Sequence, residues 1–475
     1  MENAPFYGRE EELKRLKGVT KKKSASLVVI RGRRRIGKSR LILEFSKKMK
    51  AKIFTGLPPV GGVTAAQDQR EYFAKQMEQQ LPLRAIKGED WADLFWLLAK
   101  ETKKGQLLLV FDEINWMGSE DPTFLGKLKS AWDLHFKNNP NLILILSGSM
   151  SGWIEQNILS STGFMGRISL DLTLDELPLH VCNLFWRNHK DELSAYEKFK
   201  ILSVTGGVPL YLEEIDPCLS AEENIQQLAF QRGALLVEEF DRIFSDLFSH
   251  RSHRYKMIVK RLAQGNADLG QICEAIEMEK GGTVSEYLED LVETGYVARD
   301  FTWSLKSGKE SILSKFRLKD NYIRFYLKYI EPNLHQIEKN RISRPPAWST
   351  IMGLQFENLV LHNINQVLDI IKIAPEEIVY DSPYFQKATK THPGCQIDYM
   401  IQNKYNTLYI FEIKFSKQKI DTKVIQELEQ KIHRLQRPKH FSYRPILVHV
   451  NGVTDTLLDS DYFAHTIDFS QFLQP

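Results

Sequence analysis

One short segment constrains the fold of this chain more than any other, because its residue pattern is typical of a loop between a β-strand and an α-helix. Gly32-Arg-Arg-Arg-Ile-Gly37-Lys38-Ser39 has the spacing G-x-x-x-x-G-K-[ST], in which backbone N–H groups and a helix N-terminus cradle phosphates. An apolar strand is expected before it, over Ser26–Arg31, and a helix after it, over Arg40–Met49. This order predicts a phosphate-binding loop at the edge of a parallel α/β sheet.

The glycines and polar residues of this loop have separate expected roles. Gly32 and Gly37 allow the backbone to curve around the phosphates, and the dipole of the following helix adds positive potential. Lys38 would reach the β- and γ-phosphates, and the Ser39 hydroxyl would ligate Mg²⁺. The motif therefore predicts ATP and Mg²⁺ as cofactors, and a chance match at a glycine-rich turn is the weaker alternative.

A second buried strand, expected over Gln106–Phe111, ends in two adjacent acids. Asp112 would complete the Mg²⁺ shell, and Glu113 would polarise the attacking water. The two acids could instead cap a helix, but the phosphate loop upstream favours the catalytic interpretation. A third apolar strand, Asn141–Leu146, leads into Ser147-Gly148-Ser149, which could sense the γ-phosphate or form a plain turn.

The rest of the chain changes pattern twice. Strands alternate with helices through residue 170, which predicts a doubly wound parallel sheet. Mostly helical sequence follows to about residue 245. Three short helical patterns come next, at residues 255–263, 270–277 and 284–294. A hairpin after Gly295 would complete a winged helix, but its third helix is acidic, so contact with protein is at least as well supported as reading of a DNA groove. Residues 346–475 mix strands with helices, one of them over Leu354–Leu368.

Several of these segments together resemble the archaeal-type ATPases of the AAA+/STAND class. They are Phe6-Tyr-Gly-Arg-Glu-Glu-Glu-Leu13, the phosphate loop, Val110-Phe-Asp-Glu113, the Ser-Gly-Ser turn and Gly206-Gly-Val-Pro209. The resemblance covers roughly residues 1–330 and implies an ATPase core, a helical lid, a winged helix and assembly into a homo-oligomer. It also implies that Arg9 lies near the adenine and that Pro209 belongs to a nucleotide-sensing turn. Arg167 would be an arginine finger, or equally an ordinary surface arginine.

Charged residues interrupt two apolar segments near the C-terminus that a hairpin would pair. Asp398 is followed fourteen residues later by Glu412-Ile-Lys414. Alternate residues of a strand share one face, so Glu412 and Lys414 can converge with Asp398. Glu357, on a preceding helix, could add a carboxylate. Two or three acids with a lysine suit metal-assisted phosphodiester cleavage, and a solvent-exposed Glu/Lys pair on a hairpin is the alternative.

This set of residues resembles the PD-(D/E)xK nuclease superfamily. The signature residues would be Asp398, Glu412 and Lys414, with Glu357 as the leading helix acid and Gln426 or Gln430 as the polar residue of the following helix. The resemblance implies a restriction-endonuclease-like fold in which Glu357, Asp398 and Glu412 bind Mg²⁺, with Mn²⁺ as a substitute. Ile397 stands where the superfamily name places proline.

The segment Phe316-Arg-Leu-Lys-Asp-Asn-Tyr-Ile-Arg-Phe-Tyr326 resembles the junction of ATPases whose C-terminal domain is this nuclease-like module, the DUF234 type. Four domains are therefore expected. They are a P-loop ATPase core at residues 1–175, a helical lid at 176–245, a winged helix with a linker at 246–345, and a nuclease-like domain at 346–475.

Charge is concentrated locally although the net charge is only +4. Sixteen Lys/Arg and one acid lie between Lys14 and Lys52, nine Lys/Arg and three acids between Lys414 and Arg444, and a smaller basic cluster spans Arg251–Arg261. Such clusters indicate contact with a polyanion such as DNA, because each neutralised phosphate releases counterions. For any single cluster a solvated helix face is the stronger alternative.

The composition excludes several classes of protein. No apolar run approaches the roughly 18 residues of a membrane helix, and the N-terminus has no apolar segment typical of secretion. The four cysteines lie far apart in the sequence, which excludes a disulfide framework and fits the cytoplasm.

These features together predict an ATP-dependent DNA-processing protein with Mg²⁺-dependent phosphodiester cleavage by the C-terminal domain. Two alternatives belong to other classes. One is a nucleotide-gated signalling or scaffold protein with an inactive nuclease-like domain, and the other is a DNA-binding regulator that acts through the winged helix.

Overall fold

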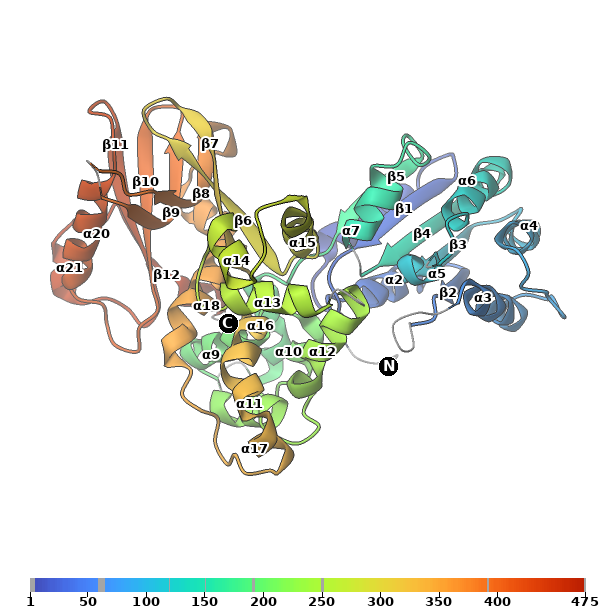
Figure 1. Ribbon diagram of the computed structural model, residues 1–475, viewed down its shortest axis with the longest axis horizontal. Coiled ribbons are helices and arrows are strands. Elements are labelled where there is room, and N and C mark those ends of the chain that lie inside the picture. Colours follow the sequence, from blue (N-terminus) through green and yellow to red (C-terminus); the bar gives the residue numbers. More distant parts are fainter. Residues whose placement is uncertain are drawn as a thin grey trace.

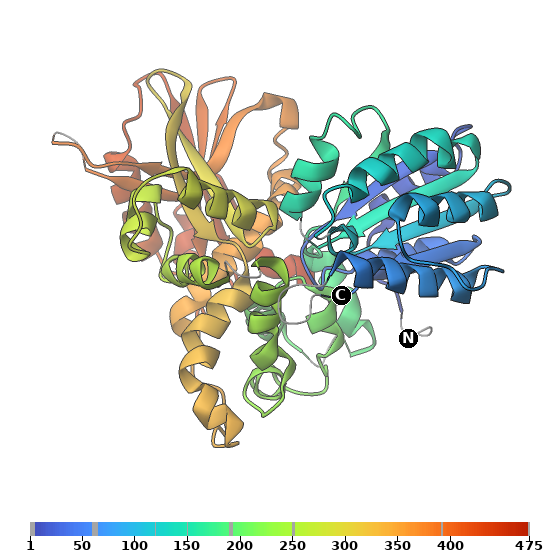
Figure 2. The same cartoon turned by 45° about the vertical axis from the view of Figure 1, so that its right-hand side comes forward.

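The computed structural model describes residues 5–58, 65–118, 120–149, 151–189, 193–248, 252–390 and 393–473. Two sheet-containing arms stand on a helical base in Figure 1, with the N-terminal sheet on the right and the C-terminal sheet on the left. The turned view in Figure 2 shows the same division. Within the described part of the chain, no helix is both long and apolar enough to cross a bilayer.

The first sheet contains five parallel strands in the order β2-β3-β4-β1-β5. Their bounds are β1 Ser26–Arg31, β2 Ala51–Thr55, β3 Leu107–Asp112, β4 Leu142–Gly148 and β5 Ile168–Thr173. In β1 and β3, five consecutive side chains are buried, as expected for strands covered on both faces. The prediction of a parallel sheet with helices on its two faces is therefore confirmed.

Helices cover both faces of this sheet, and each face has its own apolar core. One core joins the sheet to α1 (Glu10–Val19) and α2 (Lys38–Ser46). The other joins it to α3 (Ala66–Gln80), α4 (Trp91–Glu101) and α6 (Phe124–Leu134). Neither core extends beyond residue 174, so this arm is stabilised largely from within.

The middle of the chain is helical, as predicted. Its helices are α8 Leu179–Cys182, α9 Ala195–Thr205, α10 Pro209–Glu213, α11 Ala221–Ala229 and α12 Leu235–Phe248. α12 crosses the boundary expected at residue 245, and Leu236, Phe240, Ile243 and Phe244 form a buried stripe with helical spacing along it.

The elements expected between residues 246 and 345 occur in the expected order. They are α13 Ser252–Leu262, α14 Leu269–Ala275, α15 Gly282–Glu293 and the hairpin β6 Val297–Ser304 with β7 Lys309–Leu318. α15 packs against α7 (Ser151–Ile154) of the first arm, and a Cβ on Gly152 would lie 2.5 Å from Glu293 Oε2. The acidic face of this third helix therefore lies against the first domain, and its assignment to a winged helix stays a prediction.

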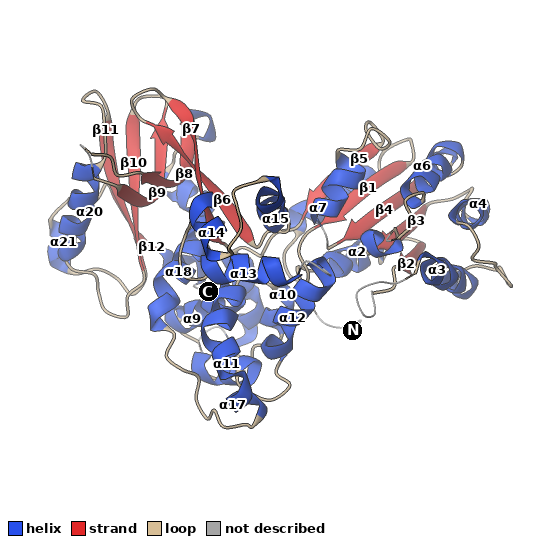
Figure 3. Cartoon of the chain, in the orientation of Figure 1, coloured by secondary structure: helices blue, strands red, loops and turns tan. Residues whose placement is uncertain are grey.

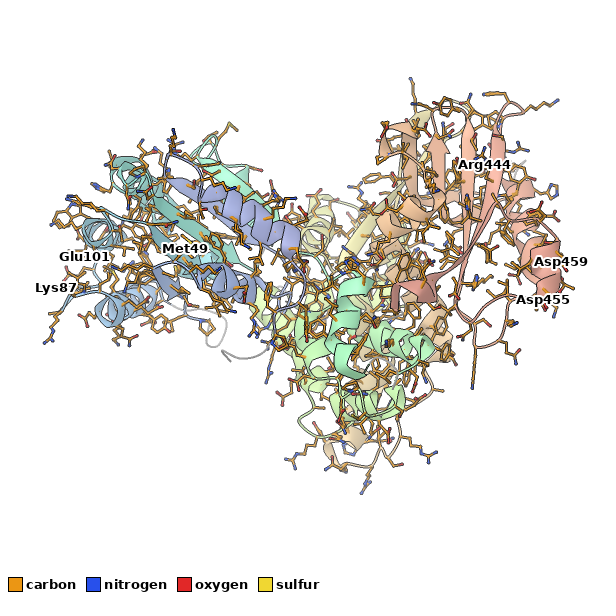
Figure 4. All side chains as sticks on the ribbon, turned by 180° about the vertical axis from the view of Figure 1, so that it is seen from behind. Met49, Lys87, Glu101, Arg444, Asp455 and Asp459 are labelled. Atoms are coloured by element: carbon orange, nitrogen blue, oxygen red, sulfur yellow. The ribbon has the colours of Figure 1, made fainter. Side chains whose placement is uncertain are left out.

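The second sheet is mixed, with the order β12-β11-β10-β9-β8 (Figure 3). Its strands are β8 Ile378–Gln386, β9 Cys395–Asn403, β10 Thr407–Lys414, β11 Ser442–His449 and β12 His465–Asp468. β9 is antiparallel to β8 and β10, whereas β10, β11 and β12 run parallel. The helix α20 (Lys423–Arg434) crosses between β10 and β11, and α21 (Asp455–Asp459) between β11 and β12. In the view from behind, Figure 4 labels Arg444 on β11 and Asp455 and Asp459 on α21.

One predicted helix is interrupted. The helix expected over Leu354–Leu368 is two helices, α18 (Ser349–His362) and α19 (Ile364–Ile371). They meet at Asn363, whose side chain donates to the Leu359 carbonyl and accepts the N–H of Leu179. These bonds satisfy backbone groups at the helix break, so the break is stable.

The helical base and the second sheet share one apolar core, which runs from Leu177 to Leu473. The last turn, Phe469–Leu473, packs back on α8 and α9, where the Phe199 and Phe469 rings stack at 5.8 Å. The lid, hairpin and C-terminal regions expected as separate domains are therefore packed together as one body in the described structure.

Candidate functional sites

The phosphate loop has the geometry that its sequence predicts. Gly32 has a φ of 151°, and a Cβ there would lie 2.5 Å from the Leu174 carbonyl oxygen, so only glycine fits. Lys38 is buried and donates to the carbonyls of Gly32 and Arg33 at 2.8 and 3.1 Å. Burial holds the pKa of Lys38 below its ordinary value, although the charges of Glu113 and Asp112 oppose this shift. A bound anion would favour the charged ammonium, and the ammonium would in turn stabilise the anion.

The two acids of β3 lie beside this loop. Asp112 Oδ2 accepts the Ser39 hydroxyl at 2.9 Å, which brings together the two groups predicted to hold Mg²⁺. Glu113 has a φ of 51°, an uncommon value for a residue with a side chain. The N–H and hydroxyl of Ser149 donate to Glu113 Oε2 at 3.2 and 2.9 Å. Burial raises the pKa of Glu113 against the opposing charge of Lys38.

A cavity of about 450 Å³ opens beside the loop. Its walls include Lys38, Ser39 and Glu113 together with Tyr7, Phe185 and Pro209. The rings of Tyr7 and Phe185 pack at 4.9 Å. Arg9 lines the cavity too, and its guanidinium donates to the carbonyls of Ile36 and Asp175 at 3.2 and 2.5 Å. The volume is in the range of small-molecule sites, and the walls combine polar with apolar side chains.

The arginines inside the loop make contacts that the sequence did not predict. Arg33 pairs with Glu176 at 2.7 Å and with Asp320, which caps α16 (Asn321–Phe325). Arg35 pairs with Glu239 of α12 at 3.1 Å, and Glu239 is wholly buried. The phosphate loop is thus tied to the helical base by ion pairs between residues 143 to 287 positions apart, a separation at which no local spacing indicates a partner.

Arg167 lies away from the loop in this chain. Its guanidinium pairs with Asp133 of α6 at 2.8 and 3.0 Å, and this pairing raises the pKa of Arg167 and lowers that of Asp133 to about 2. A role within the same chain's nucleotide site is therefore not supported by the geometry, and a role toward a neighbouring protomer stays a prediction.

Residues 6–215 match the model of a family described as an ATPase domain predominantly from Archaea. The N-terminal arm, with α8 to α10, is therefore similar to archaeal-type ATPase domains. The match supports ATPase activity and the use of a nucleotide with Mg²⁺. The donor set fits that cofactor, because a buried ammonium, a hydroxyl and a carboxylate converge beside a cavity of suitable size.

An uncharacterized protein of Methanocaldococcus jannaschii, MJECL04, is 28% identical to this chain over 337 residues, which is 70% of this chain and 71% of that protein. Among solved structures, the Walker-type ATPase PABY2304 of Pyrococcus abyssi has a TM-score of 0.48 and 18% identity, covering 68% of this chain and 96% of that chain. The ORC2 protein of Aeropyrum pernix has a TM-score of 0.40 and 15% identity, covering 71% and 97%. Both TM-scores lie below 0.5. The inference of ATPase activity therefore rests on the family match and on the geometry of the phosphate loop.

Outside the ATPase domain, the second sheet brings together the predicted C-terminal residues. Phe411 pairs with Tyr399 in the antiparallel register of β9 and β10, which places Glu412 beside Asp398. Asp398 Oδ2 accepts the N–H of Ile413 at 2.8 Å, and the Lys414 ammonium lies 3.0 Å from Glu412 Oε1. The structure therefore places Asp398, Glu412 and Lys414 in one neighbourhood, and their catalytic role stays a prediction.

A further lysine, Lys431, completes this site. It extends from α20, and its ammonium lies 3.3 Å from Asp398 Oδ1 and 2.6 Å from Glu412 Oε2. Glu427, one turn earlier on α20, binds Lys414 at 2.7 Å. The sequence predicts Gln426 or Gln430 as the polar residue of this helix, whereas the contacts to Asp398 and Glu412 come from Lys431.

Glu357 approaches the same acids from α18. Burial, reinforced by the charge of Asp398, raises the pKa of Glu357 from 4.5 to about 7. Among the described residues there is no group of three or more His, Cys, Asp or Glu side chains placed to hold a metal ion. Metal binding by Asp398 and Glu412, with Glu357 as a third ligand, therefore stays a prediction.

The raised pKa of Glu357 predicts a pH-dependent stability. Between its unfolded pKa near 4.5 and its folded pKa of about 7, the folded state binds more protons, so this group lowers the stability as pH rises through that window. We expect Glu357→Gln to be more stable than wild type by about 2–3 kcal/mol at pH 8 and nearly equal to it at pH 4.5. Urea unfolding at both pH values measures the difference, and an equal effect at both would contradict the assignment.

Several charges of the first two basic clusters pair with acids of the same chain. In the first cluster, Arg31 pairs with Glu155 and Asp171, and the loop arginines pair as described above. In the cluster near residue 255, the partners are Asp241 for Lys256 and Glu331 for Lys260, and both pairs lie at the surface. In the C-terminal cluster, the exposed cations include Lys417, Lys419, Arg434 and Lys439. Contact of these clusters with DNA stays a prediction.

Proposed function

We propose that this chain binds and hydrolyses ATP, and that the nucleotide cycle controls a C-terminal domain that cleaves phosphodiester bonds in DNA. The observation that carries the first half is the arrangement of Ser39, Asp112 and Glu113 around Lys38 beside a cavity. The family match over residues 6–215 supports the same conclusion.

Each residue of the ATPase site has a role that its contacts suit. Lys38 and the loop N–H groups would bind the phosphates, and Ser39 and Asp112 would hold Mg²⁺, which neutralises charge on the transferred phosphoryl group. Glu113 would orient the attacking water and accept its proton. Because Ser149 holds the Glu113 carboxylate with two hydrogen bonds, the position of this base depends on the end of β4.

For the C-terminal domain, the proposal rests on chemistry at the end of β10. Asp398 and Glu412 would bind a divalent metal ion, which supplies an activated water and neutralises the developing charge on phosphorus. Lys414 would stabilise the transition state. The exposed cations of the C-terminal basic cluster suit a phosphate backbone.

The winged-helix assignment and a homo-oligomer belong to the same proposal. The acidic face of α15 lies against the ATPase domain, which favours a protein-contacting role for this helix over reading of a DNA groove. The partly exposed pair of Arg167 with Asp133 lies away from the phosphate loop of its own chain. It would act on a neighbouring protomer if the arginine finger is real.

A plasmid-nicking assay with Mg²⁺, with and without ATP, tests this function. We expect wild type to nick supercoiled DNA. We expect Asp398→Asn and Lys414→Ala to lose about a hundredfold in rate, because the metal ligand or the transition-state cation is gone. Lys38→Ala should remove the dependence on ATP. Lys404→Ala, at the exposed far end of the same hairpin, is the matched control and should cut like wild type.

Equal cutting by Asp398→Asn and Lys404→Ala would show that the C-terminal site is not responsible for cleavage. A second function, a DNA-binding scaffold without cleavage, is favoured by one observation, the lysine that lies between the two acids. It predicts duplex binding by wild type without nicking, and ATPase activity that still requires Lys38.

A further inference from the structure

The acid pair of the C-terminal site already has a cation. The Lys431 ammonium lies 3.3 Å from Asp398 Oδ1 and 2.6 Å from Glu412 Oε2, so one charge bridges both carboxylates. Only 1% of the Glu412 side chain and 20% of the Asp398 side chain are exposed. Two carboxylates this buried and adjacent repel each other unless a cation lies between them.

The remaining oxygens of the pair are also engaged. Asp398 Oδ2 accepts the Ile413 N–H at 2.8 Å, and Glu412 Oε1 faces Lys414 at 3.0 Å. The two oxygens that would face a shared metal ion are therefore those that Lys431 holds. An ammonium and a divalent ion a few ångströms apart repel by several kcal/mol at the effective dielectric of a protein surface, so both cannot occupy this position.

We propose that Lys431 is the resident cation of the C-terminal site, and that a divalent metal ion binds Asp398 and Glu412 only when the Lys431 ammonium moves to a phosphate of bound nucleic acid. This inference rests on the proposed function, because it takes DNA as the ligand of the same site. Metal binding and DNA binding are then cooperative, because a DNA phosphate draws the Lys431 ammonium away from the acids and the metal ion takes its place there.

The helix geometry permits this movement. Val424, Leu428 and Ile432 anchor α20 on the sheet through its apolar face, so the backbone can stay in place. The Lys431 side chain is 29% exposed, and its four-carbon stem can rotate toward solvent. The exposed Arg434 and Lys439 lie close in sequence and would attract the phosphate that receives the ammonium.

Mn²⁺ binding to the full-length protein tests the proposal, with free Mn²⁺ measured by its electron paramagnetic resonance signal. Without DNA, we expect Lys431→Met to bind Mn²⁺ at least about tenfold more tightly than wild type, because the competing charge is gone. The Mn²⁺ that Asp398→Asn still binds is bound elsewhere in the protein and is subtracted. Lys423→Met, on the same helix but 83% exposed and next to Asp421, is the matched control and should equal wild type.

A short phosphorothioate duplex supplies the second arm. It should tighten Mn²⁺ binding by wild type about tenfold and leave Lys431→Met nearly unchanged, because only wild type has an ammonium to release. Equal Mn²⁺ affinity of Lys431→Met and wild type without DNA would overturn the assignment of Lys431 as the resident cation. A duplex that does not change the affinity of wild type would overturn the displacement step.

Thermal unfolding keeps the proposal testable if Lys431→Met folds poorly. In EDTA, Lys431→Met should melt below wild type and recover on addition of Mn²⁺, whereas wild type should not respond. A loss of stability that Mn²⁺ does not restore would show an ordinary structural ion pair instead. These readouts need no cleavage, so an absence of nicking would refute the proposed nuclease activity without deciding the role of Lys431.

Discussion

Glu113→Gln is expected to lower the rate of ATP hydrolysis about a hundredfold or more while nucleotide binding persists. Glutamine keeps the size of the side chain and can still accept the bonds from Ser149 through its carbonyl oxygen. It cannot take a proton from water at neutral pH. Because Lys38, Ser39 and Asp112 are unchanged, the phosphates and Mg²⁺ should still be held. Steady-state phosphate release and binding of a fluorescent ATP analogue measure the two effects separately.

Two further variants make this result specific. Glu101→Gln, at the exposed end of α4 (labelled in Figure 4), should hydrolyse ATP at the wild-type rate. Ser149→Ala removes the hydroxyl that holds Glu113 and should slow hydrolysis to a smaller extent, because the backbone N–H of residue 149 still donates. Hydrolysis by Glu113→Gln at the rate of Glu101→Gln would assign the base to another residue.

The strength of local signals determined which parts of the ATPase domain could be predicted from the sequence. β1, β3 and β4 are runs of consecutive buried apolar residues, and such runs identify strands covered on both faces. The phosphate loop is readable because the chemistry of a triphosphate fixes both residue types and spacing. In contrast, β5 has only one fully buried side chain, so its apolar pattern was too weak to find.

Contacts between distant segments explain most of what the sequence did not reveal. Asp398 and Glu412 could be paired because one hairpin fixes their register. Lys431 could not be placed, because its role depends on how α20 lies on the sheet rather than on spacing alone. Arg33 and Arg35 read as part of a basic cluster suited to a polyanion, but their partners Glu176, Asp320 and Glu239 are acids far along the chain.

The ion pair between Arg33 and Asp320 leads to the largest expected change in stability. The Asp320 side chain is 1% exposed and that of Arg33 8%. Asp320 also caps α16, where its Oδ1 accepts the N–H of Ile323 at 2.6 Å. We expect Asp320→Ala to lower the free energy of unfolding by about 3–5 kcal/mol, because a buried guanidinium loses one of its two acids and a helix loses its cap. Urea unfolding followed by circular dichroism measures the loss.

Asp268→Ala provides a control with the same capping role and no buried pair. Asp268 caps α14 by accepting the N–H of Gln271 at 3.1 Å, and its ion partner Lys387 is half-exposed. Its loss should cost about 1 kcal/mol. Asp320→Asn keeps a capping oxygen but not the charge and should fall between the two. Similar losses for Asp320→Ala and Asp268→Ala would show that the pair with Arg33 contributes little.

The same variant should also weaken nucleotide binding, because Arg33 belongs to the phosphate loop. Asp320 caps α16, and the first residue of that helix, Asn321, donates to the carbonyls of Leu202 in α9 and Gln355 in α18. Asp320 therefore joins the loop to helices of the base and of the C-terminal region. If this junction holds the loop in its binding geometry, Asp320→Ala should reduce ATP affinity while Asp268→Ala does not. ATP titration of both variants at a temperature where each is folded separates this effect from the loss of stability. Wild-type affinity in Asp320→Ala would mean that the loop keeps its shape without the junction.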